Sequence, residues 1–327
     1  MAEPARLMAV VVQTDRAWPD DDVERAVIEG AGHRLVSGPA TPASAEAIEA
    51  LVAAHDPRAI LTCWAPVSAR AIALPSDLGI VQRLGVGLDN IAVAAASARG
   101  AWVANVPDYC VGEVADHAVA LLLAWARGIV AFDMDVKGGR WDPAAARLRR
   151  IADLTVGIIG YGRIGRSTAS KLRAFGCRIL AHSRGRVDDP AVEAVTLDAL
   201  LAASDVVIVH APLTEATHHL LDVDRIARMR TGAFLINVSR GAIVDNQALL
   251  AALETGQIGG AGLDVVEDEP DPPRALIDRR DVIVTPHIAF SSEASLAELR
   301  RRAAEEVVRV LNGDPPQFPC NQPEGRA

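Results

Sequence analysis

The chain has 327 residues, half of them hydrophobic, and a formal net charge of −9 at pH 7. This length suits two domains, and the acidic balance argues against a nucleic-acid-binding surface, which needs a basic face. No apolar run reaches the ~18 residues that cross a membrane, and the N-terminal stretch MAEPARLMAVVVQ is too short and too weakly apolar for a signal peptide. The four cysteines form no Cys-x-x-Cys pair and no His/Cys cluster, so the sequence predicts no metal site and favours a cytoplasmic location.

The first part of the chain alternates short apolar runs with amphipathic stretches. The runs predict strands and the stretches between them predict helices, a pattern typical of a parallel sheet with helices on both faces. The expected strands span 7–13, 34–37, 59–64, 80–84 and 102–105, and the expected helices span 22–31, 43–54, 67–73 and 90–99.

The next segment, NVPDYCVGEVADHAVALLLAWARGIVAFD at 105–133, predicts one long helix near 112–133. It is apolar over most of its surface, so we expect it to be buried, partly against a second subunit. Strands and helices then alternate again, and a last amphipathic helix is expected at about 292–311. The later strands are expected at 155–159, 178–182, 192–195, 205–209, 233–238, 260–264 and 282–285.

This organisation predicts two α/β domains, each built on a doubly wound parallel sheet. Residues 104–291 contain a glycine-rich turn between a strand and a helix and are expected to form one domain. Residues 1–103 are expected to form the other, joined by 292–327, whose final part is typical of loop or disorder.

The glycine-rich turn lies in TVGIIGYGRIG at 155–165, where three glycines follow G-x-G-x-x-G spacing. The spacing alone is weak, but here it follows an apolar strand and opens a helix, which favours a dinucleotide-binding turn over an ordinary tight turn. The first glycine allows the turn, the second lets the backbone approach a pyrophosphate, and the third lets helix and strand pack closely. The helix N-terminus adds N–H groups that suit an anion. The residues expected to contact the dinucleotide here are Gly160, Gly162, Arg163, Ile164 and Gly165.

The next strand ends in HSRGR at 182–186, where a dinucleotide site usually places an Asp or Glu. Such a carboxylate would bind the ribose hydroxyls of NAD and would repel the 2′-phosphate of NADP by roughly 1 to 4 kcal/mol at about 4 Å. Ser183 removes that repulsion, and Arg184 and Arg186 can pair with a phosphate. The charges therefore favour NADP over NAD. The alternative is that both arginines are solvated loop residues and that NAD binds regardless.

Three later stretches place polar residues just after apolar strands. They are NVSRGAIVDNQAL at 237–249, GLDVVEDEP at 262–270 and VTPHIAFSS at 284–292. Because the carboxyl ends of the strands face the cofactor crevice in a doubly wound sheet, the polar side chains of these stretches are expected to converge. Each alone has an ordinary explanation, as an ion-pair residue, a buried histidine or a carboxylate at a helix start. The converging residues are expected to be Arg240, Asp264, Glu269 and His287.

In order and spacing, these and other motifs resemble the D-isomer-specific 2-hydroxyacid dehydrogenase family over nearly the whole chain. The resemblance implies two Rossmann-like domains with the active site in the cleft between them, and a homodimer built on the long helix. It also implies an NAD(P)-dependent oxidoreductase that transfers a hydride between nicotinamide and a small 2-oxo acid or D-2-hydroxy acid. The matching stretches are LGVGLDNI at 84–91, VADHAVALLLA at 114–124, TVGIIGYGRIG at 155–165, HAPLTEATHHLLD at 210–222, INVSRGAIVD at 236–245, AGLDVVEDEP at 261–270 and TPHIA at 285–289.

By motif, Arg240, Glu269 and His287 match the catalytic residues of that family. His287 would give a proton to the carbonyl oxygen in reduction and accept one in oxidation. Glu269 would stabilise the protonated imidazole and orient its ring. Arg240 would hold the substrate carboxylate and polarise the carbonyl group. Glu267 is a rival for the carboxylate, but the family pattern places that residue immediately before the proline.

The resemblance extends to the substrate and to the rest of the cofactor. The loop GVG at 85–87 matches one whose N–H groups bind the substrate carboxylate, through Val86 and Gly87. Trp64, in TCWAPV, either lines the pocket or packs beside it. The remaining residues expected at the cofactor are His210, Ala211 and Pro212 beside the adenosine half, Asp264 at the nicotinamide end, and Val238 and Ala289.

Within the family, the motifs favour a glyoxylate/hydroxypyruvate reductase. The loop TCWAPVSAR is apolar where members that bind phosphoglycerate use an Arg, and the chain shows no regulatory domain. Glu269 argues against formate as substrate, and the lack of Lys at 85–87 argues against phosphite. A phosphoglycerate dehydrogenase without a regulatory domain stays an alternative. A dinucleotide-sensing protein like the C-terminal-binding corepressors is another, because VPDYCVGEVADHAVALLL resembles that branch too.

Overall fold

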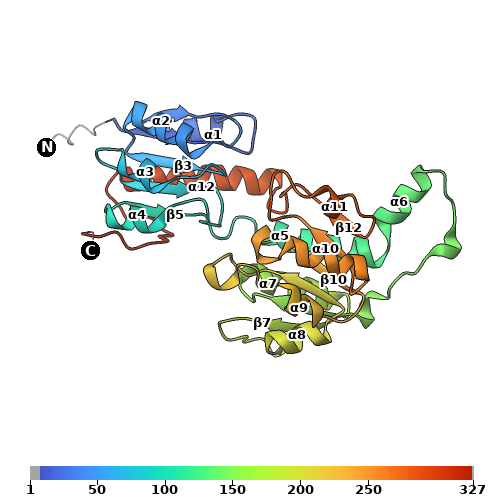
Figure 1. Cartoon of the computed structure of the whole chain (residues 1–327). Helices are drawn as coiled ribbons and strands as arrows, with labels where there is room; N and C mark the ends of the chain where they lie inside the picture. The colour runs from blue at the N-terminus through green and yellow to red at the C-terminus, as the bar shows by residue number, and fades with distance from the viewer. Residues whose placement is uncertain (1–7, 326–327) are drawn as a thin grey trace. The chain divides into compact units, whose positions relative to one another are not determined.

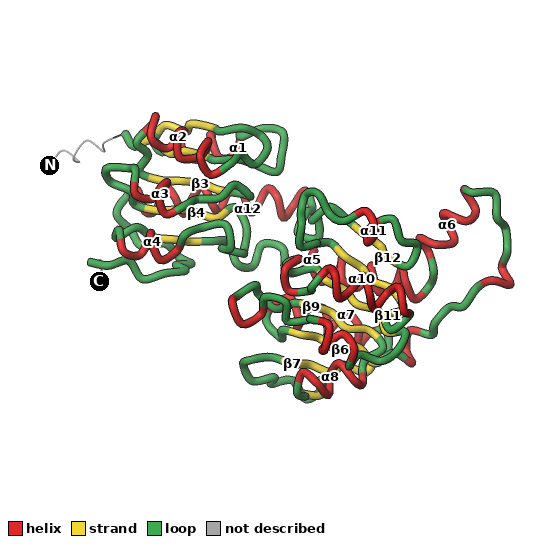
Figure 2. Tube along the Cα trace, viewed as in Figure 1, coloured by secondary structure: helices red, strands yellow, loops and turns green. Residues whose placement is uncertain are grey.

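The computed structural model describes residues 8–325, which form two compact units. The first runs to Tyr109 and resumes at Ser292, and the second comprises Cys110–Ser291. The first boundary falls after Tyr109 rather than after residue 103, because the chain beyond strand β5 (Trp102–Ala104) still pairs with the first unit, through Val106 N and Gly85 O at 3.2 Å. Figure 2 shows helices, strands and loops along the trace.

The first unit is built on a five-stranded sheet in the order β2-β1-β3-β4-β5, with every pairing parallel. All residues of β3 and β4 are buried, as expected for inner strands of a sheet covered on both faces. The first strand was expected at 7–13; it begins at Val10, and residue 7 lies outside the described residues. The other elements are α1 (Asp22–Gly30), β2 (Arg34–Ser37), α2 (Ala45–His55), β3 (Ala59–Thr62), α3 (Ala69–Ala73), β4 (Ile80–Arg83), α4 (Val93–Ala98) and α12 (Glu293–Leu311).

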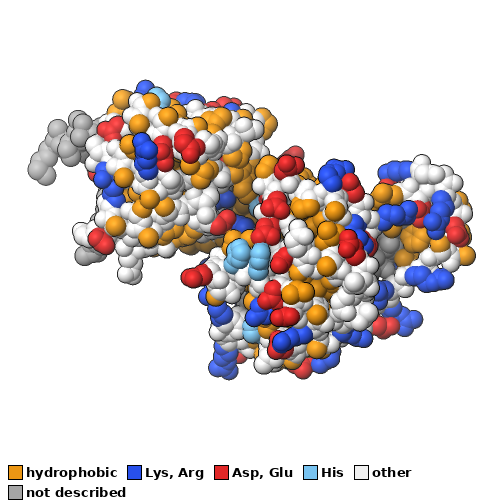
Figure 3. Space-filling model, viewed as in Figure 1, with side chains coloured by type: hydrophobic (Ala, Val, Ile, Leu, Met, Phe, Trp, Pro, Cys, Tyr) orange, Lys and Arg blue, Asp and Glu red, His pale blue; other side chains and the backbone are white. Residues whose placement is uncertain are grey.

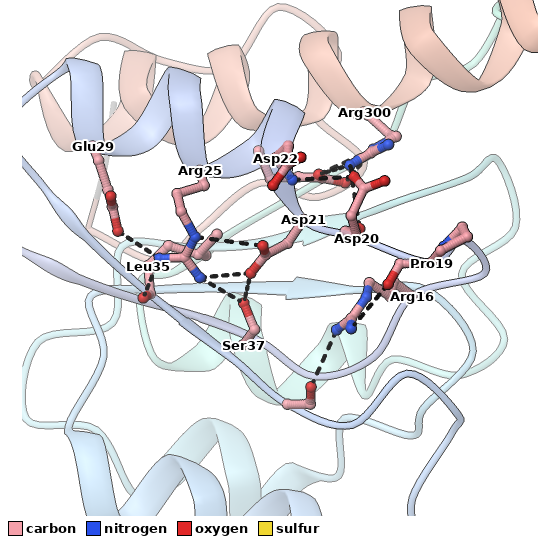
Figure 4. A network of polar contacts seen from close by, with 12 residues as sticks. Arg16, Pro19, Asp20, Asp21, Asp22, Arg25, Glu29, Leu35, Ser37 and Arg300 are labelled. Atoms are coloured by element: carbon pink, nitrogen blue, oxygen red, sulfur yellow. Dashed lines mark hydrogen bonds and ion pairs between the residues drawn. The ribbon is translucent and has the colours of Figure 1, made fainter.

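Helix α12 returns from the end of the chain to pack on α1 (Figure 1). The Arg300 guanidinium donates to both oxygens of Glu24 at 2.8–3.1 Å. It also donates to Asp20 Oδ1 at 2.6 Å (Figure 4). It also lies 5.3 Å from the centre of the Trp18 ring. The Glu24 carboxylate is fully buried, so Arg300 balances a charge that would otherwise be unpaired in the core.

The segment that follows α12 lies along the outer edge of β5. Cys320 N donates to Val103 O at 2.7 Å, Val103 N donates to the Asn321 side chain at 2.7 Å, and Ala104 forms an antiparallel bridge with Pro319. The segment is a loop, as expected, and its backbone is anchored to β5 as far as Asn321, so this part is not disordered. The polar groups of an exposed sheet edge are thereby covered.

The second unit is built on a seven-stranded parallel sheet in the order β12-β11-β10-β9-β6-β7-β8. Its strand order reverses between β6 and β9, where a doubly wound sheet opens its ligand crevice. The elements are α5 (Val111–Ala126), α6 (Ile129–Lys137), β6 (Thr155–Ile159), α7 (Arg163–Ala174), β7 (Arg178–His182), β8 (Glu193–Ala194), α8 (Leu197–Ala203), β9 (Val206–Val209), α9 (Val223–Ala227), β10 (Ala233–Asn237), α10 (Asn246–Thr255), β11 (Ile258–Leu263), α11 (Arg274–Ile277) and β12 (Val282–Val284). Short 3-10 turns lie at Pro143–Ala145, Ile151–Asp153, Glu215–Thr217 and Gly241–Ile243.

The prediction of one continuous helix near 112–133 is wrong. The chain breaks at Gly128, whose φ of 62° is left-handed, and a side chain there would clash with the Phe132 ring. Helix α5 is largely buried, whereas α6 has no buried residue and projects from its unit (Figure 1). The exposed apolar side chains of this arm, α6 and the following loop to 148, are Ile129, Val130, Met134, Val136, Trp141 and Leu148.

Within residues 8–325, no helix combines the length and the apolar character that a membrane span requires.

Candidate active site

The glycine-rich turn joins β6 to α7 at the point where the strand order reverses. Gly160 has a φ of 98°, and a Cβ there would lie 2.6 Å from the carbonyl group of His210. A Cβ at Gly165 would lie 2.2 Å from Gly160 O. At Gly162, by contrast, a Cβ would meet nothing within 4 Å. The first and third glycines are thus required by the packing of the protein itself, and the second leaves its backbone open to a ligand. This arrangement fits a dinucleotide pyrophosphate.

The chain at the end of β9 lies directly behind the turn. His210 N donates to Ile159 O at 2.7 Å, and the ring Nε2 contacts Thr168 Oγ1 at 2.9 Å. Ring Nδ1 is buried with no hydrogen-bond partner among the described residues, and burial lowers the pKa of His210 to about 3. His210 is therefore neutral and its side chain serves the interior. Beyond it, Ala211 is buried and Pro212 is exposed.

The residues expected to select the cofactor lie on the loop after β7. Ser183 is half-buried and its Oγ accepts from Gly185 N at 3.3 Å. Arg184 and Arg186 are exposed, and Arg186 forms a loose ion pair with Asp188 at 3.7 Å. Both arginine side chains are therefore exposed to solvent beyond the carboxyl end of β7.

An acidic residue of the same loop is already engaged. Asp189 accepts from Tyr161 OH at 2.9 Å and from Arg173 at 3.3 Å, while Arg166 stacks 4.8 Å from the centre of the Tyr161 ring. Burial and the bond to Asp189 raise the pKa of Tyr161 to about 12. Hydrogen bonds from Ala191 N and Tyr161 OH lower the pKa of Asp189, so its carboxylate stays ionised beside the turn.

His287 and Glu269 form a direct pair. His287 Nδ1 lies 2.7 Å from Glu269 Oε2, and Glu269 Oε1 accepts from Val266 N at 3.0 Å. Both carboxylate oxygens are therefore fixed, and the imidazole is oriented by one of them. With a carboxylate at Nδ1, that nitrogen carries hydrogen, which makes Nε2 the ring nitrogen suited to proton exchange. Glu269, and not Glu267, is the carboxylate beside His287.

The backbone that carries His287 is held by Asp264. The Asp264 side chain is almost fully buried and accepts from Thr285 Oγ1 at 2.6 Å, from Ile288 N at 2.9 Å and from Ala289 N at 2.8 Å. Asp264 O also accepts from His287 N at 2.8 Å. These bonds secure a left-handed residue, since His287 has a φ of 55°. The expected contacts of Asp264 and Ala289 with the cofactor stay predictions, and both residues have this second, internal role.

His117 of α5 completes this group. Its Nε2 lies 2.9 Å from Thr285 Oγ1, whose own hydrogen is directed to Asp264. His117 therefore donates this bond, which fixes the hydrogen on Nε2. Sequence analysis assigned no function to His117 or Thr285, although both lie in the matching stretches, because their contact joins positions 168 residues apart.

Arg240 follows β10 and lies against the segment that carries Glu269. Its carbonyl oxygen accepts from the Asn237 amide at 2.8 Å, and its own guanidinium donates to Ser239 O at 2.8 Å. A Cβ at the next residue, Gly241, would lie 2.1 Å from the carbonyl carbon of Val266, so the two loops touch through their backbones. Val238, in the same loop, is buried. The ends of β10, β11 and β12 thus bring the catalytic candidates of this unit to one edge of the sheet.

The candidate substrate loops belong to the first unit. The Arg83 guanidinium donates to Gly87 O at 2.9 Å and to Leu84 O at 2.7 Å, and the Asn105 amide donates to Val86 O at 2.7 Å. The loop at 85–87 is therefore held through its carbonyl oxygens. This leaves the backbone N–H groups of Val86 and Gly87 as the predicted carboxylate contacts.

The loop that carries Trp64 is organised by a buried carboxylate. Asp15 accepts from the backbone N–H groups of Cys63, Trp64 and Ala65 at 2.6–3.0 Å. The Trp64 ring is half-buried and Arg83 lies 5.4 Å from its centre. Asp15 escaped sequence reasoning because no motif surrounds it. Trp64 packs on Arg83, and its contact with a substrate stays a prediction.

Known proteins are similar to this chain in sequence and in structure. The sequence profile of the D-isomer specific 2-hydroxyacid dehydrogenase NAD-binding domain matches residues 119–289. A glyoxylate reductase of Korarchaeum cryptofilum is 39% identical over 266 residues, which cover 79% of this chain and 80% of that protein. A D-3-phosphoglycerate dehydrogenase of Archaeoglobus fulgidus is 37% identical over 262 residues, but this chain spans only half of its length.

A solved structure is similar over nearly the whole chain. It is an NADPH-dependent glyoxylate/hydroxypyruvate reductase from Sinorhizobium meliloti in complex with NADP and malonate, with a TM-score of 0.82 and 30% identity, covering 96% of this chain and 97% of that one. The expectation of an NAD(P)-dependent oxidoreductase is confirmed. The chain belongs to the D-isomer specific 2-hydroxyacid dehydrogenase family.

Proposed function

We propose that this protein reduces a small 2-oxo acid to the 2-hydroxy acid, with glyoxylate and hydroxypyruvate as the best candidates and NADP preferred to NAD. The observation that carries the proposal is the pair of His287 Nδ1 and Glu269 Oε2 at 2.7 Å, on a loop fixed by Asp264. A carboxylate-oriented histidine is the group that carbonyl reduction needs, because the oxygen must gain a proton as negative charge builds on it.

The residues of this chain have distinct roles in that reaction. Bound nicotinamide supplies the hydride. His287 delivers a proton from Nε2 to the carbonyl oxygen, while Glu269 holds Nδ1 and keeps the ring in place. Arg240 holds the substrate carboxylate in fork geometry and polarises the carbonyl group. Val86, Gly87 and Trp64 are the proposed substrate contacts of the first unit.

Cofactor choice is assigned to the loop after β7. Ser183 lacks the charge that would repel a 2′-phosphate, and the exposed Arg184 and Arg186 are available to pair with it at the cost of one loose ion pair. The Ser183→Asp variant should lower the ratio of kcat/KM for NADPH to that for NADH by about 10- to 1,000-fold. Ser170→Asp, an exposed charge on α7, is the matched control and should leave the ratio unchanged. An unmoved ratio in Ser183→Asp would refute the phosphate assignment.

A panel of 2-oxo acids tests the activity itself. Purified protein should oxidise NADPH with glyoxylate and hydroxypyruvate, and bulkier acids and 3-phosphohydroxypyruvate should react more slowly. Trp64, Ala65 and Pro66 offer no cation to a phosphate group. Fastest turnover of the phosphorylated acid would favour the phosphoglycerate alternative. NADPH binding without turnover of any acid would favour a dinucleotide-sensing binding protein.

The exposed apolar arm supports a homodimer. Helix α6 and the following loop carry Met134 and Trp141 in solvent, where such side chains mark interaction surfaces. Light scattering after size exclusion should give twice the 34.5 kDa of the chain, and Met134→Glu with Trp141→Glu should shift it towards the monomer. A monomeric wild-type protein would contradict this. The cytoplasmic location stays a prediction from the sequence.

A further inference from the structure

We propose that His218, His219 and Glu267 form a binding site for a divalent transition-metal ion, with zinc as the best-suited ion. One ring nitrogen of each histidine and one carboxylate oxygen of Glu267 lie within 4.8 Å of one another. The histidines lie on the loop after β9 and the glutamate lies on the loop after β11, 48 residues from His219, so no spacing pattern in the sequence reveals the cluster.

The donor set suits zinc. Zinc takes imidazole nitrogen at 2.0–2.1 Å and carboxylate oxygen at 2.0–2.2 Å in tetrahedral geometry, which sets neighbouring ligand atoms about 3.4 Å apart. His219 Nε2 now lies 2.6 Å from Glu267 Oε1, so binding requires these two atoms to separate by roughly 0.8 Å. Both side chains lie on loops and are partly exposed, which permits such a movement. Water completes the coordination shell.

A further carboxylate lies near the central ligand. Asp245 Oδ2 is 3.9 Å from Nδ1 of His219, which is close enough for charge attraction but too far for a hydrogen bond. A histidine ligand characteristically presents one ring nitrogen to the metal and the other to a carboxylate, which fixes the tautomer and raises ligand basicity. Nε2 is the nitrogen of His219 that contacts Glu267, so Nε2 is the proposed metal ligand and Nδ1 is the nitrogen nearest Asp245.

The backbone brings two successive histidine rings to the same side. Side chains of neighbouring residues in an extended chain point apart. His219 instead has a left-handed φ of 46°, and its ring stacks on that of His218 with centroids 4.1 Å apart. His219 N donates to Ala242 O at 2.8 Å, which anchors this disfavoured conformation. Histidine side chains gather at the surface in Figure 3, with acidic side chains near them.

A bound ion would join two loops beside the active-site candidates. Glu267 lies in the short segment between Val266 and Glu269, and the hydrogen bond from Val266 N to Glu269 Oε1 closes that segment. Ala242, which anchors His219, lies two residues after Arg240. Metal binding would therefore tie the loop after β9 to the segment that orients His287. The inference concerns binding, so it stands or falls independently of the proposed substrate.

Calorimetric titration of chelator-treated full-length protein with zinc sulfate tests the site. The wild type should bind one ion per chain, and 100 times the Kd of zinc should raise Tm by roughly 5 to 10 °C. His219→Asn keeps a residue that tolerates the left-handed conformation, and Glu267→Gln keeps the shape of the side chain. Each should weaken zinc binding at least 10-fold, while His55→Asn in the first unit should not change it.

Three results would overturn the proposal. The first is that the wild type binds no zinc, and the second is that the wild type and both variants bind zinc with equal affinity. The third is that His287→Gln loses affinity for zinc while His219→Asn keeps it. Circular dichroism and NADPH binding check that each variant folds. If His219→Asn does not fold, cobalt replaces zinc and Glu267→Gln alone decides. A tetrahedral cobalt absorption spectrum that this change leaves unaltered would equally refute the site.

Discussion

The ion pair between Glu24 and Arg300 should be the costliest polar contact to break in the first unit. The Glu24 carboxylate is fully buried and accepts three hydrogen bonds of 2.8–3.1 Å from one guanidinium group. Removing one partner of a buried pair leaves an uncompensated charge and typically costs 3–5 kcal/mol. We therefore expect Glu24→Leu, which leaves Arg300 with only the exposed Asp20 as a partner, to lower the free energy of unfolding of this unit by about 3–5 kcal/mol. Asp20→Asn, at the exposed end of the network, should cost far less, because solvent screens that contact.

The double variant provides a second, sharper test. With both Glu24 and Arg300 replaced by Leu, no buried charge stays unpaired, because Asp20, the other partner of Arg300, is exposed to solvent. The double variant should therefore be more stable than either single variant. Native-state hydrogen exchange measures this locally, because the opening free energies of amides in α1 and α12 report the first unit and those in α7 serve as an internal reference. Additive losses in the double variant, or a loss below about 1 kcal/mol in Glu24→Leu, would refute the account.

The remaining predictions concern the second unit. His287→Ala should reduce kcat by roughly 10²- to 10⁴-fold while NADPH still binds in a fluorescence titration, and full activity would rule out its role as acid. Gly162→Ala should fold normally but bind dinucleotide weakly, whereas Gly165→Ala should also lower Tm, because only its Cβ meets protein backbone; equal Tm losses would contradict the open approach at Gly162. His210, with its pKa lowered to about 3, binds its proton mainly in the unfolded state, so its contribution to stability is complete above about pH 6.5 and is lost as the pH falls towards 3. At pH 5 the loss should be about 2 kcal/mol in urea titrations and absent in His210→Gln; an unchanged pH profile in that variant would contradict this.

The sequence predicted the two sheets well because burial governs their strands. Runs such as AILT and VVIV are buried at every residue, so they lack alternation and indicate inner parallel strands. The break after α5 was missed because α6 is as apolar as a core helix although it is exposed. The apolar composition of α6 therefore suggested a buried helix, and Gly128 was the one sign in the sequence of the break between α5 and α6. The anchoring of the C-terminal segment had no sequence signal, since it depends on hydrogen bonds that the Asn321 side chain and the Cys320 backbone make with residues some 200 positions earlier.

The candidate site also contains some residues that the sequence predicted and others that it did not. Motifs predicted Arg240, Glu269 and His287, and the structure brings Glu269 and His287 into contact. From the residues alone, Glu267 was a rival to Glu269. In the structure each carboxylate contacts its own histidine, His219 for Glu267 and His287 for Glu269. The residues that hold this geometry escaped sequence reasoning, because their roles consist of contacts between distant segments. They are Asp15, Arg83, His117 and Thr285.

The return of α12 to the first unit has a consequence for biosynthesis. Glu24 and Arg300 are 276 residues apart, so at about 5–20 residues per second the ribosome makes the partner of Glu24 roughly 14 to 55 seconds after Glu24 itself. The second unit is continuous in sequence and can fold as it emerges. The N-terminal segment must wait, with Glu24 unpaired, until Arg300 has been made. Chaperones that bind nascent chains should therefore encounter the N-terminal segment for longer than any other part of this protein.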